Sequence, residues 1–154
     1  MTTDRSLGQA PADRLSPFRY EVPEGREFPK KSMRLAKRGL LSVAVQVINA
    51  GGETNMHAHT GEDEAWLVIA GRARFHGAGD EPPVELGPRE GIVVPAGVPY
   101  WFESASTEQL EIVRMAAGVP GVRDERVNYQ PLSDWQRGHG LEGRGPQQGD
   151  APGA

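Results

Sequence analysis

Two histidines, His57 and His59, are separated by a single alanine, and Glu64 follows after a short polar run. Because side chains alternate between the faces of a β-strand, imidazoles at i and i+2 lie on the same face. The run 60–63 predicts a tight turn that returns Glu64, at the start of the next apolar strand, to that face. Two neutral imidazoles and one carboxylate make a divalent metal site with open positions, as in non-haem iron centres. Metal-assisted chemistry is therefore the leading hypothesis.

Two glycines bracket this group at a recognisable spacing. The order is Gly51, five residues, His57, one residue, His59, four residues, Glu64, six residues, Gly71. It resembles the first conserved motif of the cupin superfamily, and all five defining positions match. The resemblance covers residues 40–116 and implies a small double-stranded β-helix barrel that holds a metal near its mouth. The alternative is a pair of exposed strand histidines beside an acidic turn.

The second cupin motif is only partly present. Residues 95–97 match its Pro-x-Gly turn, but Arg89, Tyr100 and Ser104 stand where the family has Gly, His and Asn. A phenol, with a reference pKa of about 10, coordinates a metal well only as a phenolate. We expect Tyr100 to donate a hydrogen bond to metal-bound water or substrate. The alternatives are a weak or conditional fourth ligand and a plain aromatic wall. Tyr100 and Glu64 are the candidate catalytic residues.

Three further side chains bear on the ligand set. His76 would replace the missing fourth imidazole if it pointed inward, although a surface position is the simpler expectation. Glu62 and Asp63 would in principle substitute for Glu64. Only Glu64 keeps the family spacing, so the other two are interpreted as turn residues.

Strand alternation also predicts a substrate pocket, because Trp66 and Val68 share a face with Glu64. Aromatic lining suits an apolar or planar small molecule with a few polar handles. The alternative is that these rings simply fill a small barrel. Arg72 and Arg74 would meet an anionic group, although solvated strand arginines are commoner. The expected pocket residues are Trp66, Val68, Phe102, Arg72, Arg74 and His76.

The elements that must position these residues are short strands separated by turn signals. Segment 41–47, for example, alternates with period two and is rich in β-branched residues. The pattern predicts an all-β sandwich or barrel. The cupin resemblance implies that it is a single double-stranded β-helix, a jelly-roll-like barrel, with flexible extensions at both ends. The expected strands are 41–47, 57–59, 65–70, 72–75, 84–86, 92–94, 100–102 and 110–115.

The ends of the chain lack this regularity. Residues 1–31 predict an extended N-terminal arm, 32–118 the cupin barrel, and 119–154 a C-terminal extension that is disordered from about residue 137. The basic residues between 26 and 38 are expected to form a solvated strand edge or a subunit contact.

The composition narrows the function classes. The 154 residues carry a net charge of −4, which gives no general attraction to nucleic acid or membrane. The absence of cysteine excludes disulfides, thiolate nucleophiles and Cys-ligated zinc. No signal-peptide h-region or run of about 18 apolar residues is present, so a cytoplasmic protein is expected. Exposed barrel edges favour a homodimer, as in many cupins.

The leading hypothesis is a metal-dependent enzyme that acts on a small organic molecule. The expected ion is iron, with manganese, nickel or zinc as alternatives. Cupins include dioxygenases, isomerases, lyases and polyketide-type cyclases. The resemblance therefore implies an oxygenase or a Lewis-acid isomerase, cyclase or lyase in a tailoring step of specialised metabolism. The alternatives are a non-catalytic small-molecule-binding or sensor cupin, and an interaction protein whose histidines are incidental.

Overall fold

The computed structural model describes residues 8–138 and 141. Within them the chain is all β, and no helix has the length and apolar character needed to cross a bilayer. The strands are β1 (Lys30–Arg38), β2 (Leu41–Ile48), β3 (His57–His59), β4 (Glu62–Ala70), β5 (Ala73–Gly77), β6 (Val84–Leu86), β7 (Gly91–Val94), β8 (Tyr100–Ser104), β9 (Leu110–Gly118) and β10 (Arg126–Asn128).

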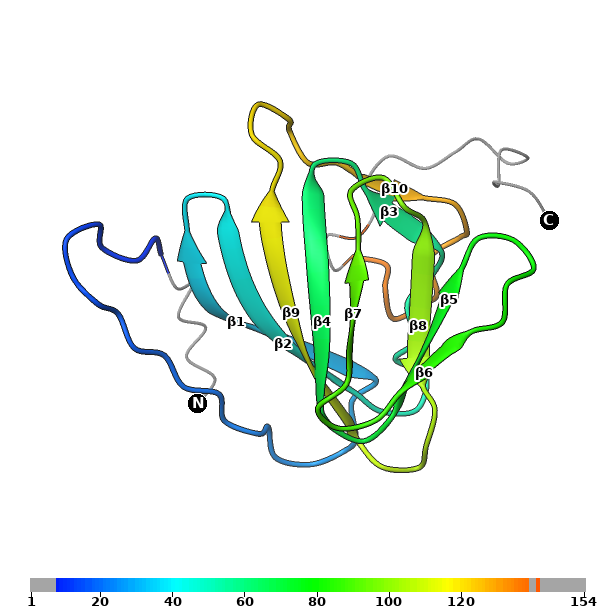
Figure 1. The fold of residues 1–154 in the computed structure, drawn as a ribbon. Helices are drawn as coiled ribbons and strands as arrows, with labels where there is room; N and C mark the ends of the chain where they lie inside the picture. The colour runs from blue at the N-terminus through cyan, green and yellow to red at the C-terminus, as the bar shows by residue number, and fades with distance from the viewer. Residues whose placement is uncertain (1–7, 139–140, 142–154) are drawn as a thin grey trace.

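The strands form two antiparallel sheets of five strands each (Figure 1). The first has the order β1-β2-β9-β4-β7 and the second the order β10-β3-β8-β5-β6. Strands far apart in sequence are neighbours, since β4 pairs with β9 and β3 pairs with β8. This crossing pattern is that of a jelly roll. The predicted all-β double-stranded β-helix is confirmed.

Two strands were not expected from the sequence. β1 begins at Lys30, inside the segment 1–31 that was predicted as an arm, and pairs along its length with β2. Its charged sequence shows no hydrophobic alternation. As an edge strand, β1 agrees with the solvated strand edge expected for the basic residues.

β10 lies in the segment predicted as a C-terminal extension. It pairs with β3, so that Arg126 lies opposite His59 and Asn128 opposite His57. Backbone bonds from Thr60 N to Glu125 O and from Tyr129 N to Met56 O extend this ladder at both ends. The segment after β9 thus completes the sheet beside the histidines. Most of the tail predicted to be disordered lies outside the described residues.

The barrel interior below the histidines is filled by side chains. Trp66, Val68, Phe102 and Ile112 are each at most 2% exposed. The ring of Phe102 lies 4.9 Å from Trp66 and stacks on Phe75 at 4.8 Å. Burial of such aromatic and aliphatic surface drives the two sheets together. A ligand therefore binds at the end of this packed layer, where Trp66 lies beside Tyr100, rather than in its interior.

One motif glycine has a clear steric role. Gly71, in the turn after β4, has φ +77°, and an added Cβ would lie 2.7 Å from the carbonyl oxygen of Gln109. Only glycine satisfies both the left-handed backbone and the close approach. The turn lets the chain leave the first sheet and enter β5 of the second.

Candidate metal centre

The two motif histidines lie on β3, which has a neighbouring strand on each side in the second sheet. β3 is flanked by β10 and β8, and His57 has Tyr100 as its partner on β8. The imidazole rings of His57 and His59 are 5.5 Å apart between centroids, and the ring of Tyr100 is 4.6 Å from His57. His57 is 2% exposed. The i, i+2 spacing thus brings both imidazoles together at one end of the barrel.

Each imidazole already has an oxygen partner at Nδ1. His57 Nδ1 lies 2.7 Å from the carbonyl oxygen of Asn55, and His59 Nδ1 lies 3.0 Å from Asp124 Oδ2. Because a carbonyl oxygen only accepts, His57 Nδ1 carries the proton, and the carboxylate favours the same tautomer in His59. Burial, followed by the charge of Arg126, lowers the pKa of His57 well below 6.5. Both rings are left with Nε2 as the atom for binding a metal.

Glu64, the carboxylate of the motif, is buried at 2% exposure. Tyr100 OH donates to Glu64 Oε1 at 2.9 Å, and Arg114 Nε donates to Glu64 Oε2 at 2.5 Å. Burial and the charge of Glu64 raise the pKa of Tyr100 well above 10, so it remains a phenol that donates a proton. Burial lowers the pKa of Arg114, but the charges of Glu64 and Glu62 outweigh it and leave the value raised. Glu64 is therefore held as one half of a buried ion pair.

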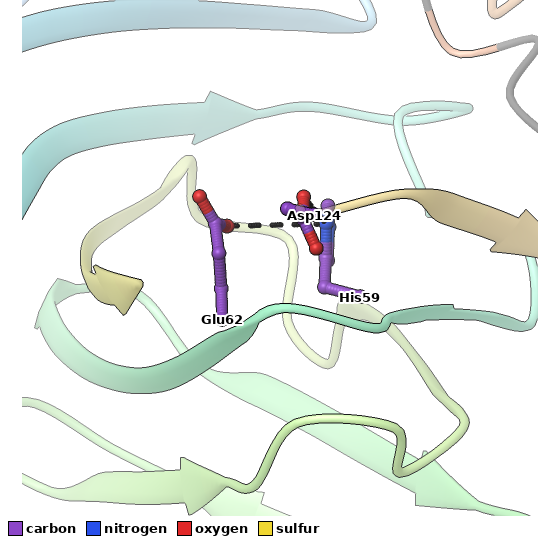
Figure 2. A group of neighbouring side chains, drawn as sticks. All are labelled: His59, Glu62 and Asp124. Carbon is purple, nitrogen blue, oxygen red and sulfur yellow. Dashed lines mark hydrogen bonds and ion pairs between the residues drawn. The ribbon is translucent and has the colours of Figure 1, made fainter. Parts of the chain in front are cut away.

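His59, Glu62 and Asp124 form a second group of potential ligands (Figure 2). One ligand atom from each lies within 4.8 Å of the others. Glu62 and Asp63, interpreted from sequence as turn residues, instead begin β4. Glu62 Oε2 accepts a hydrogen bond from Arg114 Nη2 at 2.5 Å and lies 3.9 Å from His59 Nδ1. Glu62 is thus closer to a histidine than the turn interpretation implied.

Gly61 makes the approach of Asp124 feasible. Its backbone nitrogen donates to Asp124 Oδ1 at 3.0 Å, and an added Cβ would lie 2.7 Å from the backbone nitrogen of Asp124. The backbone nitrogen of Glu125 also donates to Thr60 Oγ1 at 2.9 Å. Glycine at position 61 therefore lets the segment before β10 pack against the residues between β3 and β4.

The predicted ligand triad is brought together in part. His57 and His59 are neighbours, and Tyr100 links them to Glu64 because it contacts both the His57 ring and the Glu64 carboxylate. His57 and Glu64 do not belong to the group in Figure 2, which contains His59, Glu62 and Asp124.

Two further cations lie at this end of the barrel, and sequence reasoning assigned neither to the site. Lys30 Nζ lies 5.8 Å from the ring centroid of Phe102 and 5.6 Å from that of Trp135. Burial, followed by the charges of Arg126 and Arg114, lowers the pKa of Lys30 to about 7.

Arg126 is the second of these cations. It donates from Nε to Asn128 Oδ1 at 3.0 Å and from Nη2 to Asn55 Oδ1 at 2.6 Å, and burial lowers its pKa to about 10. We refer to the following residues together as the barrel mouth: Lys30, His57, His59, Glu64, Tyr100, Arg114 and Arg126.

The predicted pocket residues divide between the two sides of the sheets. Trp66, Val68 and Phe102 point into the barrel and are at most 2% exposed. Arg74 and His76 alternate with the buried Phe75 and lie on the outer face of β5.

On that outer face, Arg74 is paired with Glu85 and Glu103. His76 stacks on Trp101 at 3.9 Å, so it is not a fourth ligand in this arrangement. Arg72 lies near Glu85 with its side chain 47% exposed. Two surface hollows share Trp101 and Glu53 in their lining, and neither is lined by His57, His59 or Glu64.

One of the missed residues had a usable signal. On β9, Leu110, Ile112 and Ala116 are buried and point inward, and Arg114 occupies the same alternating face. A charged residue at an inward position of an apolar strand predicts a buried partner. Asp124 and Arg126 come from a charged segment without alternation, so the sequence offered no comparable signal.

The fold and this arrangement define a small β-barrel with a histidine and carboxylate site at one end. Residues 44–115 match a cupin family in sequence, and the chain has the fold of the cupin superfamily. The family model described as "Cupin domain" matches residues 44–115, which include the complete first motif. No curated protein matches the sequence.

Solved structures show the same fold. A cupin superfamily protein from Desulfitobacterium hafniense is 21% identical, with 68% of this chain and 97% of that chain covered at a TM-score of 0.55. An uncharacterized conserved protein with a double-stranded β-helix domain from Klebsiella pneumoniae is 20% identical. The match covers 66% of this chain and 80% of that chain at a TM-score of 0.56. The cupin domain of Cnp3 from Schizosaccharomyces pombe is 15% identical. The match covers 60% of this chain and 66% of that chain at a TM-score of 0.54. At these identities the similarity establishes the fold alone.

The donor set of the barrel mouth fits a divalent metal ion. Imidazoles whose Nδ1 atoms are bound to a carbonyl and a carboxylate have the outer partners usual for metal-binding histidines. Carboxylate oxygens from Glu64 or Glu62 complete a mixed nitrogen and oxygen set that suits iron, manganese, nickel and zinc alike. Each carboxylate oxygen has two lone pairs, so a bond from Arg114 does not by itself block coordination.

Proposed function

We propose that this protein is a metal-dependent cupin enzyme acting on a small organic molecule, with His57, His59 and Glu64 as the metal ligands. The observation that carries the proposal is the engagement of Nδ1 in both histidines by Asn55 and Asp124. It leaves Nε2 of both imidazoles available to a metal, and Tyr100 links the His57 ring to the buried carboxylate of Glu64. A divalent ion bound there would supply Lewis-acid polarisation of a substrate oxygen or, as iron, redox chemistry.

The surrounding residues have distinct roles in this proposal. Tyr100 keeps its proton and orients Glu64 through the 2.9 Å hydrogen bond. Arg114 balances the charge of the buried carboxylate. Trp66 and Phe102 close the interior below the site and exclude water from it. The reaction class within the proposal is oxygenation or a Lewis-acid isomerisation, cyclisation or elimination.

One observation favours a second candidate, a non-catalytic small-molecule-binding cupin. Arg114 already places a positive charge 2.5 Å from Glu64 Oε2 and the same distance from Glu62 Oε2. A fixed guanidinium paired with both carboxylates weakens the electrostatic attraction for a metal cation. A barrel that has lost its metal but kept its shape would look this way.

Elemental analysis of the full chain separates the two candidates. The metal-dependent enzyme requires near-stoichiometric iron, manganese, nickel or zinc in purified protein, and loss of that metal in His57→Ala. His76→Ala is the matched control, because His76 stacks on Trp101 at the outer face. Protein that folds, binds small molecules and never retains metal would favour the second candidate.

The proposal extends to a homodimer through the outer face of the first sheet. Leu67, Ile69 and Val93 are 39%, 42% and 70% exposed there. Ala65 lies between Val93 and Met115 in register, so the apolar surface continues across three strands. Light scattering should give a dimer mass, and Val93→Lys should give a monomer with unchanged metal content. A monomeric wild-type chain would remove this part of the proposal.

A further inference from the structure

Two cations at the barrel mouth have no direct carboxylate partner among the described residues. Glu62 and Glu64 are both bound by Arg114. Asp124 is bound by His59 and by the backbone of Gly61.

No carboxylate of the described chain lies within 4.0 Å of Lys30 or Arg126. Arg126 is instead held by the neutral amides of Asn55 and Asn128. The two cations are close enough to lower the pKa of Lys30, and neither has an anion paired to it directly.

Lys30 is placed unusually for a lysine on an edge strand. It lies opposite Ile48, which belongs to the hydrophobic core, so its side chain is on the inward face of the first sheet. Its ammonium lies over the rings of Phe102 and Trp135. Removing an ammonium from water is costly unless an anion compensates it. Its neighbour Lys31 points the other way and packs on Phe28.

An independent observation points to the same region. Trp66, at 2% exposure, has an indole Nε1–H with no hydrogen-bond acceptor among the described residues. Buried donors in native proteins almost always have a partner, so this one requires an acceptor that the described chain does not supply. Trp66 and Lys30 pack against the same ring, that of Phe102, at 4.9 and 5.8 Å. The indole and the unpaired ammonium thus surround one ring, that of Phe102.

We propose that the barrel mouth binds a small aromatic organic anion, with its carboxylate or phosphate held between Lys30 and Arg126 and an acceptor oxygen available to Trp66 Nε1. The anion supplies the direct partner that the two cations lack and the acceptor that the indole lacks. The ring of Trp135, which is only half-buried and lies beside the Lys30 ammonium, provides flat apolar surface for the body of the ligand. The inference deepens the proposed function, since it names the ligand class of the same site.

Binding is tested by calorimetry on the full chain with three related probes. Benzoate and phenyl phosphate carry the two anionic groups on the same ring, and benzamide is the neutral counterpart of benzoate. We expect at least one anion to bind, and benzamide to bind at least about tenfold more weakly, which corresponds to about 1.4 kcal/mol. The stronger of the two anions identifies the preferred head group.

Variants locate the binding site. Lys30→Met should lower the affinity for the more tightly bound anion at least about tenfold, and Lys30→Arg should restore part of that affinity. Lys31→Met should leave the affinity unchanged. Lys30→Met removes a buried charge, so it is expected to fold. Arg126→Gln provides a second test at the other cation. Equal affinity for benzamide and benzoate, equal affinity in Lys30→Met and wild type, or no binding of either anion would overturn the proposal.

The same samples separate this inference from the proposed function. Each calorimetric titration is run on protein as purified and again after chelator treatment, with metal content measured in both. Anion binding that depends on Lys30 and persists without metal supports the inference even if the protein proves metal-free. Stoichiometric metal in a protein that binds neither anion overturns the inference and leaves the metal centre intact.

Discussion

Arg114 Nε lies 2.5 Å from Glu64 Oε2, and the two residues come from neighbouring strands of the first sheet. In the β4–β9 register, Arg114 is opposite Trp66, so its guanidinium reaches across the strand to Glu64 and Glu62. The side chain of Glu64 is 1% exposed and that of Arg114 is 16% exposed. The carboxylate of the cupin motif is thus already charge-balanced by the protein.

Arg114→Met should destabilise the fold by about 3 kcal/mol, because it leaves a buried carboxylate without its cation. Urea denaturation measures the change. Arg74→Met is the matched control, since Arg74 also joins two carboxylates but lies on the outer face with its side chain 33% exposed. We expect a much smaller loss for the control, because water screens an exposed ion pair. Equal losses would contradict the buried character of the Arg114–Glu64 pair.

Tyr100→Phe should lower the free energy of unfolding by about 1–2 kcal/mol, since Glu64 Oε1 loses its phenol donor. Metal content should remain close to that of the wild type while turnover of any identified substrate falls. The reason is the raised pKa of Tyr100, which keeps it a hydrogen-bond donor. Elemental analysis checks this, and loss of the metal on removal of one hydroxyl would make the tyrosine a ligand.

Glu64→Ala should release far more metal than Glu62→Ala. This expectation follows from the assignment of Glu64, which keeps the family spacing, as the ligating carboxylate. The competing assignment is the group His59, Glu62 and Asp124, whose ligand atoms lie within 4.8 Å of one another. Metal retained in Glu64→Ala but lost in both Glu62→Ala and Asp124→Asn would establish that group as the binding site instead.

Lys30 should make the stability of the metal-free protein rise with pH near neutrality. Its pKa is about 7 in the folded state, against 10.5 as the ordinary value. Below pH 7 both states are protonated and the cost of the buried charge is fully present. Above pH 7 the unfolded chain binds more protons than the folded one, so the free energy of unfolding increases with pH.

Lys30→Met should remove this increase between pH 6 and 9, whereas Lys31→Met should keep it. The groups that act on Lys30 are Arg126 of β10 and Arg114 of β9, while His57 of β3 is affected by it in turn. Denaturation curves across the pH range give the slope for each variant. If the free energy of unfolding of Lys30→Met rises with pH as steeply as that of the wild type, Lys30 is hydrated and has an ordinary pKa.

Gly61→Ala should destabilise the protein by about 1–3 kcal/mol, the usual cost of inserting an atom into a close contact. The added methyl group would lie 2.7 Å from the backbone nitrogen of Asp124 and would separate that residue from His59. Gly77→Ala is the control, because nothing lies within 4 Å of an added Cβ there. A fully stable Gly61→Ala variant with unchanged metal content would show that the contact is not required.

The sequence predicted the barrel well and its mouth only in part. Alternation and turn glycines identified the central strands, because half-buried strands display one apolar face. Strand alternation also predicted that Trp66 and Val68 point inward with Glu64, as they do in the structure. Charged strands such as β1 and β10 show no alternation, since their stability comes from pairing with a neighbour rather than from their own apolar face.

The partners of the motif residues were harder to predict. Asp124 reaches His59 from 65 positions away in the chain, and Arg126 becomes its strand neighbour through the same fold. Long-range contacts of this kind depend on loop paths that local patterns do not encode. The alternation of faces along β9 predicts an inward position for Arg114, because Ile112 and Ala116 are buried on the same face.

Much of the chemistry around the histidines is contributed by chain on either side of the conserved domain. The family model ends at residue 115, yet Asp124, Arg126 and Asn128 come after it, and Lys30 precedes residue 44, where it begins. An assignment transferred from a protein with the same barrel is therefore informative only where the flanking segments correspond as well. An expression fragment trimmed to residues 44–115 would lack Lys30, Asp124 and Arg126, and with them both cations of the proposed anion site.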